Sequence, residues 1–286
     1  MPPLLDSSLL LVGPGRVGLA FARSWTAAGG RIAGIVARDP SRVSIADLGD
    51  VPLLSEGEAR LPGCDILILA VSDDAIAAAA TKWAGRLACR YAFHFSGALG
   101  SDELASLRRG GSSVGSLHPV RPFTGGRNED WRGVLVAVEG DTAAADVGEA
   151  IARAVGARPY RLAAEAKPLY HAAASLAAGG AAAIVSVAVR AWVAAGIPEE
   201  IARETLAGLA SRATAAVGEH PFAEAFTGAV ARRDVGTVRT HARALAGHEE
   251  ALNLYRALGE EILRRTSGRG KEKEIREILR AGRAPF

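Results

Sequence analysis

The chain has 286 residues, of which 49% are hydrophobic and 23% are charged, and its net charge is +3. This length is enough for two domains of ordinary size, and the composition excludes global disorder. The two cysteines, Cys64 and Cys89, stand apart from any Cys/His cluster, which excludes a disulfide framework and zinc or iron–sulfur sites. We therefore expect a cytoplasmic protein without a bound metal.

The first half of the sequence alternates short apolar runs with helical stretches. Such near-continuous apolar runs are typical of a parallel sheet that is buried on both faces. The predicted strands are Leu9–Val12, Ile32–Val36, Ile66–Val71, Tyr91–Phe95, Val114–Leu117, Val134–Val138 and Arg158–Leu162. The predicted helices between them are Arg16–Ala28, Ala75–Ala84, Ser101–Arg109 and Thr142–Val155. This order predicts a doubly wound α/β domain of the Rossmann type over residues 1–162.

After Leu162 the strand signals stop and long helical stretches follow. We predict helices over Ala163–Ala195, Pro198–Gly218 and Asp234–Arg265, which form an all-helical domain at 163–265. The uncharged run Ala172–Val189 has the length of a membrane span, but half of it is alanine. We interpret it as a buried helix whose small residues allow close packing, in a domain interior or a homodimer interface.

The C-terminal stretch carries most of the excess positive charge. Residues 264–286 contain 8 basic and 3 acidic residues, and we interpret 266–286 as a solvated basic tail. A nucleic-acid partner would require a basic face with interleaved aromatic residues, and the only aromatic residue in the tail is Phe286. We therefore expect neither a nucleic-acid nor a membrane partner.

A glycine-rich loop follows the first predicted strand and opens the first helix. Gly13-Pro14-Gly15-Arg16-Val17-Gly18 matches the dinucleotide-binding pattern G-x-G-x-x-G inside one βαβ unit. Gly13 would form the tight turn, Gly15 would admit a pyrophosphate, and Gly18 would let the helix pack on the strand. The helix N-terminus would then stabilise the phosphate charge.

The residues after the second strand indicate which dinucleotide is bound. Arg38 lies twenty residues after Gly18, where an arginine accommodates a ribose 2′-phosphate, and Ser41 and Arg42 could assist it. We therefore favour NADP. NAD stays open if Asp39, rather than Arg38, faces the ribose.

Polar residues follow three further strands at the edge where ligands bind in such sheets. Val71-Ser72 and Ser96-Gly97 suit the path of the dinucleotide, whereas His118 and Arg121 suit the substrate side. The alternative for Asp73 or Asp74 is a cap of the helix that starts at Ala75, and His94 is interpreted as a packed core histidine.

Several segments together resemble a Rossmann-like oxidoreductase family whose second half is a domain of unknown function. The segments are the glycine loop, Ala70–Ile76, His94–Leu99, Ser116–Pro119, Lys167–Ala174 and Thr227–His241. Relatives of this family are pyrroline-5-carboxylate reductase, ketopantoate reductase and the β-hydroxyacid dehydrogenases. The resemblance implies a nicotinamide-linked reductase with a helical domain that often dimerises. The sequence departs from the family at Gly179, where an asparagine is usual, and at Ala229, where a proline is usual.

The predicted catalytic residues are Lys167, His171 and His118. Lys167, His171 and Ser175 share one face of a helix, and Lys167 matches the lysine that the resemblance implies for a dehydrogenase. Lys167 or His171 could donate the proton that accompanies hydride transfer. Arg121, Ser175, Arg232 and His241 are the predicted substrate residues, with arginine suited to a carboxylate.

The sequence thus predicts an NADP(H)-dependent oxidoreductase, acting on a small anionic keto or imine compound, that forms a homodimer. The alternative is a non-catalytic dinucleotide-binding or sensor protein, or a degenerate homologue. The glycine at position 179 favours this alternative.

Overall fold

The computed structural model describes residues 4–126, 128–266 and 270–281. The described chain divides into two compact units between Ser175 and Leu176. The sequence placed this boundary at 162/163. The division lies later because the helix that starts at Lys167 is anchored to the first unit, where the Lys167 ammonium donates to Ser96 and Ser116.

Eight strands of the described first unit form one sheet in the order β3-β2-β1-β4-β5-β6-β7-β8. The strands are β1 (Leu9–Val12), β2 (Ile32–Ala37), β3 (Leu53–Ser55), β4 (Ile66–Leu69), β5 (Tyr91–His94), β6 (Ser113–Pro119), β7 (Leu135–Gly140) and β8 (Arg158–Arg161). Neighbouring strands are parallel except for the antiparallel pair β6–β7. This arrangement confirms the predicted Rossmann-type sheet, and it places the ends of β1, β2, β4, β5 and β6 at one edge.

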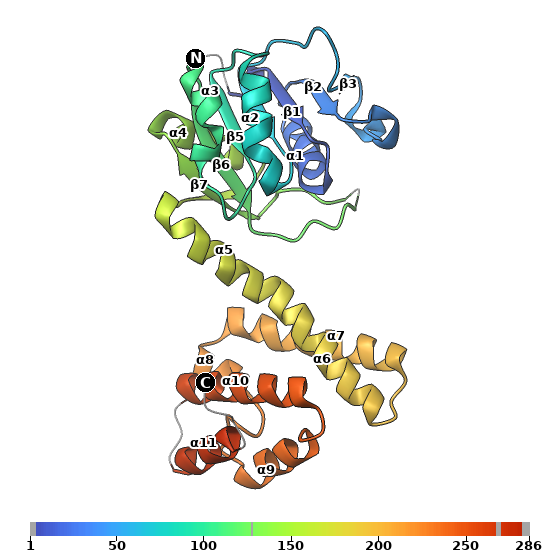
Figure 1. Ribbon diagram of the computed structural model, residues 1–286, viewed down its shortest axis with the longest axis vertical. Coiled ribbons are helices and arrows are strands. Elements are labelled where there is room, and N and C mark those ends of the chain that lie inside the picture. The colour runs from blue at the N-terminus through green and yellow to red at the C-terminus, as the bar shows by residue number, and fades with distance from the viewer. Residues whose placement is uncertain (1–3, 127, 267–269, 282–286) are drawn as a thin grey trace. The chain divides into compact units, whose positions relative to one another are not determined.

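Helices cover both faces of the sheet (Figure 1). The α-helices of this unit are α1 (Arg16–Ala27), α2 (Ile76–Ala84), α3 (Ala105–Arg109), α4 (Thr142–Ala154) and α5 (Lys167–Ser175). Short 3₁₀ helices are η1 (Leu4–Asp6), η2 (Pro40–Arg42), η3 (Ala46–Leu48), η4 (Asp73–Ala75), η5 (Ser101–Leu104) and η6 (Ala164–Ala166).

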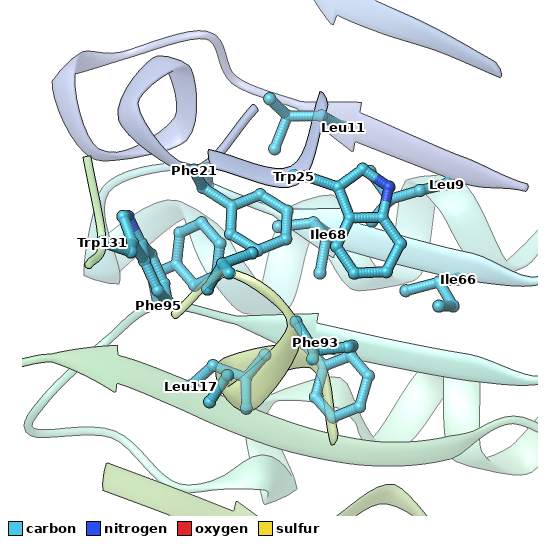
Figure 2. Close-up of a cluster of buried hydrophobic side chains, with 14 of the residues drawn as sticks. Leu9, Leu11, Phe21, Trp25, Ile66, Ile68, Phe93, Phe95, Leu117 and Trp131 are labelled. Carbon is cyan, nitrogen blue, oxygen red and sulfur yellow. The ribbon is translucent and has the colours of Figure 1, made fainter. Parts of the chain in front are cut away.

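Side chains of β1, β2, β4, β5 and β6 enter two separate cores, one on each face of the sheet. Leu9 and Leu11 of β1 pack with Phe21 and Trp25 of α1, whereas Leu10 packs on the α2 side. Figure 2 shows the first core, in which the rings of Phe21, Phe95 and Trp131 meet. Burial on both faces explains why the strands are visible in the sequence as apolar runs.

The second unit is helical, as the sequence predicted. Its helices are α6 (Ala181–Ala194), α7 (Glu199–Glu219), α8 (Phe222–Ala225), α9 (Val235–Ala244), α10 (Glu249–Arg265) and α11 (Glu272–Arg280). A single π-helical turn, η7 (Leu176–Gly180), joins α5 to α6. The predicted helix Asp234–Arg265 is two helices, α9 and α10, because the backbone leaves the helix between Leu245 and His248.

Two expectations for this unit are corrected. The helical run Ala164–Ala194 is long and apolar enough to span a membrane, yet only 6% of its apolar window is buried within the chain. It is therefore not buried in a domain interior, and the homodimer interface stays a prediction. Of the predicted basic tail, 267–269 and 282–286 lie outside the described residues. Its helix α11 is packed rather than solvated, since Ile275 and Leu279 enter a core with Val238 and Leu263.

Candidate functional site

The glycine loop adopts the conformation that a close approach of the backbone requires. Gly13 has φ 88°, and its N–H donates to Val36 O at 3.0 Å. A Cβ at Gly13 would lie 2.5 Å from Ala70 O, and one at Gly18 would lie 2.6 Å from Gly13 O. Gly15 differs, because no heavy atom lies within 4 Å of where its Cβ would stand. Packing therefore requires glycine at 13 and 18, whereas Gly15 faces open space.

That open space is a hollow of about 550 Å³ at the carboxyl ends of β1, β2 and β4. Its volume is that of a small-molecule site. The hollow is lined by the predicted cofactor residues Gly13, Pro14, Gly15, Arg38, Arg42, Val71 and Ser72, and also by Asp39, Glu56 and Lys82. Arg16, Val17 and Gly18 form the first turn of α1, next to it.

The charged groups after β2 bear on the choice between Arg38 and Asp39. The Asp39 carboxylate accepts hydrogen bonds from Ser41 N at 3.1 Å and Ser41 Oγ at 2.6 Å, and so caps η2. Arg38 and Arg42 line the hollow, and among the described residues neither guanidinium group makes a hydrogen bond or an ion pair. The Asp39 carboxylate thus accepts hydrogen bonds within its own turn, whereas the N–H donors of the two guanidinium groups are available to a ligand in the hollow.

The loop after β5 is held from three directions. Ser96 Oγ donates to Asp73 Oδ2 at 2.8 Å and accepts from Leu99 N, while Ser96 O accepts from Lys167 Nζ at 3.1 Å. His94 is fully buried, with its ring nitrogens bonded to Ser96 N and Gly100 O. Burial lowers the pKa of His94 to about 4. His94 is the packed histidine that the sequence suggested.

Lys167 lies beneath this loop rather than at the surface. Its side chain is 1% exposed, and besides Ser96 O it reaches Ser116 Oγ at 2.8 Å. Ser116 in turn donates to the buried carboxylate of Glu139 at 3.1 Å. Burial lowers the pKa of Lys167 to about 8, although the nearby Glu139 and Asp73 oppose that shift. The predicted catalytic lysine therefore ties α5 to β5, β6 and β7.

Two histidines and a tyrosine surround Gly97. His118 Nδ1 and Tyr170 Oη lie 2.7 Å apart, and the rings of His118 and His171 meet edge to face at 5.5 Å. A Cβ at Gly97 would lie 2.7 Å from His118 Nε2 and would clash with His171 Nδ1. Glycine is therefore required where the backbone passes between the two imidazoles.

The His118–Tyr170 pair is uncharged near pH 7. Burial, assisted by the positive charges of His171 and Lys167, lowers the pKa of His118 to about 4. Burial raises the pKa of Tyr170 to about 12. His118 and Tyr170 therefore form a hydrogen-bonded imidazole–phenol pair that holds protons without net charge.

The predicted substrate residues have varied surroundings. Arg121 donates to Asp130 O at 3.1 Å and lies over the Phe123 ring, and Ser175 is exposed at the end of α5. In the second unit Arg232 is exposed, and His241 Nδ1 is 3.1 Å from Tyr255 Oη.

The neighbours of Arg232 have structural roles. Asp234 caps α9 by accepting from Thr237, and the buried Arg233 donates to Thr266.

Sequence reasoning missed several residues of this edge. Tyr170 lies within a motif that was recognised, so its hydroxyl could have been proposed. Glu139 also left a signal, since it is an acidic residue directly after an apolar run. Glu56 and Lys82 left none, because only the fold brings them to the hollow.

The chain is similar in sequence or in structure to several known proteins. Residues 134–262 match a domain of unknown function, DUF2520. Comparison with curated proteins gives no match. Among solved structures, protein TM1727 from Thermotoga maritima has a TM-score of 0.72 at 21% identity, covering 95% of this chain and 99% of that one.

Two further structures share the fold. A candidate NADP oxidoreductase from Bacteroides fragilis has a TM-score of 0.71 at 21% identity, covering 91% of this chain and 99% of that one. Pyrroline carboxylate reductase from Plasmodium falciparum, solved with NADP bound, has a TM-score of 0.56 at 13% identity, covering 97% and 100%. These findings confirm the resemblance stated from the sequence: a Rossmann-like fold whose second half contains the domain of unknown function.

Proposed function

We propose that this chain, whose residues 134–262 match DUF2520 and include the last two strands of the Rossmann-type sheet, is an NADP(H)-dependent oxidoreductase that reduces a small anionic keto or imine compound. The proposal rests on the groups that lie together at the edge of the sheet where β1, β2, β4, β5 and β6 end. This edge holds a hollow between the glycine loop and two unpaired arginines, and the His118–Tyr170 pair stands at the end of β6. Solved structures that share this fold include proteins named for NADP or NAD.

The residues of the hollow fit a dinucleotide. The space in front of Gly15 admits a pyrophosphate next to the N-terminus of α1. Arg38 and Arg42 offer paired donors to a 2′-phosphate. Ser41 donates twice to Oδ1 of Asp39 and holds that carboxylate in the cap of η2, which disfavours its rotation toward a ribose hydroxyl. These contacts support NADP over NAD.

When bound, the dinucleotide supplies or accepts a hydride. Ser96 and Gly97 stand at the next strand end, where Lys167 and Asp73 hold the loop in place. We assign Lys167 a positioning role, since its ammonium donates to Ser96 and Ser116 beneath the loop.

We assign to His118 and Tyr170 the transfer of a proton to the substrate. In the tautomer that we assign, Tyr170 donates to Nδ1 of His118, and Nε2 carries a proton toward Gly97. As the substrate carbon gains a hydride, Nε2 gives its proton to the carbonyl oxygen or imine nitrogen. Tyr170 transfers its proton to Nδ1, and solvent restores the phenol. Arg121 and Ser175, and Arg232 and His241 in the second unit, stay predicted substrate residues.

The test is a fluorescence titration with NADPH and, separately, NADH, repeated on Arg38→Asp. We expect tight NADPH binding, weak NADH binding and loss of that preference in the variant. Binding of neither dinucleotide would overturn the proposal. With binding established, oxidation of NADPH would be followed against 2-oxo acids and cyclic imines.

Gly179 supports the second candidate, a non-catalytic dinucleotide-binding protein. No heavy atom lies within 4 Å of where its Cβ would stand, so packing does not explain why glycine replaces the family's asparagine. NADPH binding without turnover of any 2-oxo acid or cyclic imine, in the parent chain and in Gly179→Asn, would favour this candidate. Turnover by either protein would favour the reductase.

We also propose that the chain is a homodimer that covers α6 and α7. Large apolar side chains are exposed on these two helices, namely Ile184, Val193, Ile201, Leu209 and Val217, and Leu176 is exposed in the preceding turn η7. Length and composition alone are weak evidence for a membrane span, and burial against a second copy would shield these side chains equally well.

Sedimentation velocity tests this assembly. We expect a dimer that Leu209→Glu splits, while Leu258→Glu on α10 leaves it intact. A monomeric parent chain, or one that floats with lipid vesicles, would contradict the dimer.

A further inference from the structure

The far end of the hollow contains an ion pair that the glycine-loop pattern does not include. Glu56 follows β3 and Lys82 lies in the last turn of α2, and both line the hollow together with Arg38 and Arg42. Lys82 Nζ is 2.8 Å from Glu56 Oε1. The side chains are 44% and 31% exposed, so the hollow and solvent can both reach the pair.

The backbone of Glu56 is fixed independently of this pair. Glu56 N–H donates to Ala37 O at 2.9 Å, directly before Arg38. Arg86 donates to Glu56 O at 2.8 Å and also to Glu58 O, and its guanidinium lies over the Trp83 ring. The backbone of Glu56 is thereby kept next to the end of β2 by contacts that do not involve Lys82.

Two carboxylates and three cationic side chains therefore face this end of the hollow. The Asp39 carboxylate is engaged by Ser41, so Glu56 is the acidic group whose charge Lys82 controls. A free carboxylate here would repel a 2′-phosphate and would accept a hydrogen bond from an unphosphorylated ribose.

We infer that Lys82 is a specificity-determining residue, which selects a phosphorylated ribose by neutralising Glu56. The inference rests on the proposed function and adds a determinant outside the strand that carries Arg38. Lys82 acts through Glu56 as well as through its own charge. The two residues are therefore coupled, and removal of Glu56 compensates for loss of Lys82.

The test is a double-mutant cycle read as binding rather than activity. Calorimetric titrations with NADPH, NADH, adenosine 2′,5′-bisphosphate and adenosine 5′-monophosphate are made on the parent chain, Lys82→Met, Glu56→Gln and the double variant. Arg86→Gln is the matched control, because it loosens the same loop without changing a charge that lines the hollow. Melting temperatures establish that each variant folds.

We expect Lys82→Met to weaken NADPH and the bisphosphate by about fivefold, in keeping with a partly exposed charge pair. NADH and the monophosphate are expected to bind equally well or better. The double variant is expected to regain most of the lost NADPH affinity, and Arg86→Gln to keep the preference.

Two results would overturn the inference. One is an unchanged NADPH preference in Lys82→Met, and the other is a double variant as weak as Lys82→Met. In both cases the parent chain still binds NADPH, so the proposed function survives. A parent chain that binds neither dinucleotide would overturn both.

Discussion

The ionisation of His118 depends on individual neighbours. Burial is the largest cause of its low pKa, and the charge of His171 is the next. A nearby positive charge disfavours protonation, so removing it raises the pKa. We predict that His171→Asn moves the pKa of His118 up from about 4, as followed by the imidazole signals in an NMR titration. An unchanged His118 pKa would show that the two rings do not interact electrostatically.

The depth of Lys167 shows the limit of sequence reasoning at the residue scale. The spacing of Lys167, His171 and Ser175 correctly predicted a shared helix face. Spacing does not reveal depth, and along that face Lys167 is buried while Ser175 is exposed. The Lys167 ammonium donates to Ser96, in the loop after β5, and to Ser116 of β6, which are 71 and 51 residues earlier in the chain, and only the fold brings these groups together.

At the scale of elements, α11 is a packed part of the second unit. Leu279 is 1% exposed, and a Cβ at Gly259 of α10 would lie 2.9 Å from it. We predict that Leu279→Ala lowers the free energy of unfolding by about 2–4 kcal/mol, since it leaves a cavity. Leu258→Ala, at a position 38% exposed, should cost well under half as much. Equal urea midpoints for the two variants would argue against a packed α11.

Most strands were predictable to within two residues because, apart from β8, each is an apolar run between polar turns. The exception is β3, which has only three residues, and none of them is fully buried. The helices were harder to divide. The apolar spacing continues from α9 into α10, so nothing in the sequence pattern indicates that the four residues Leu245–His248 leave the helix. The packing of α11 was missed because its many charges hide two buried side chains.

At the scale of the whole molecule, buried bases make stability depend on pH. His94 and His118 have folded pKa values of about 4, against 6.5 for free histidine. Between these values the unfolded chain binds more protons than the folded chain, so acidification favours unfolding. We predict that the free energy of unfolding falls steadily from pH 6.5 to pH 4, and that His118→Asn makes the decline shallower. A flat profile in calorimetric melting would contradict these low pKa values.

Lys167 makes the free energy of unfolding depend on pH in the alkaline range. Its folded pKa is about 8, against 10.5 for free lysine. Between these values the unfolded chain again holds the extra proton, so stability gains from rising pH. We predict that Lys167→Met removes a gain between pH 8 and pH 10.5 that the parent chain shows. An identical alkaline limb in both proteins would place the lysine in a solvated setting.

The most direct measurement for the central claim, dinucleotide binding at the glycine loop, is a calorimetric titration of the parent chain and of Gly15→Ala with NADPH. The added methyl group meets no atom of the protein and the backbone at 15 has φ −77°, so the variant should fold with an unchanged melting temperature. It would, however, occupy the space in front of the α1 N-terminus. We predict saturable binding to the parent chain and at least a tenfold loss in the variant, about 1.4 kcal/mol. Equal affinity of the two proteins would place the dinucleotide elsewhere and contradict the account.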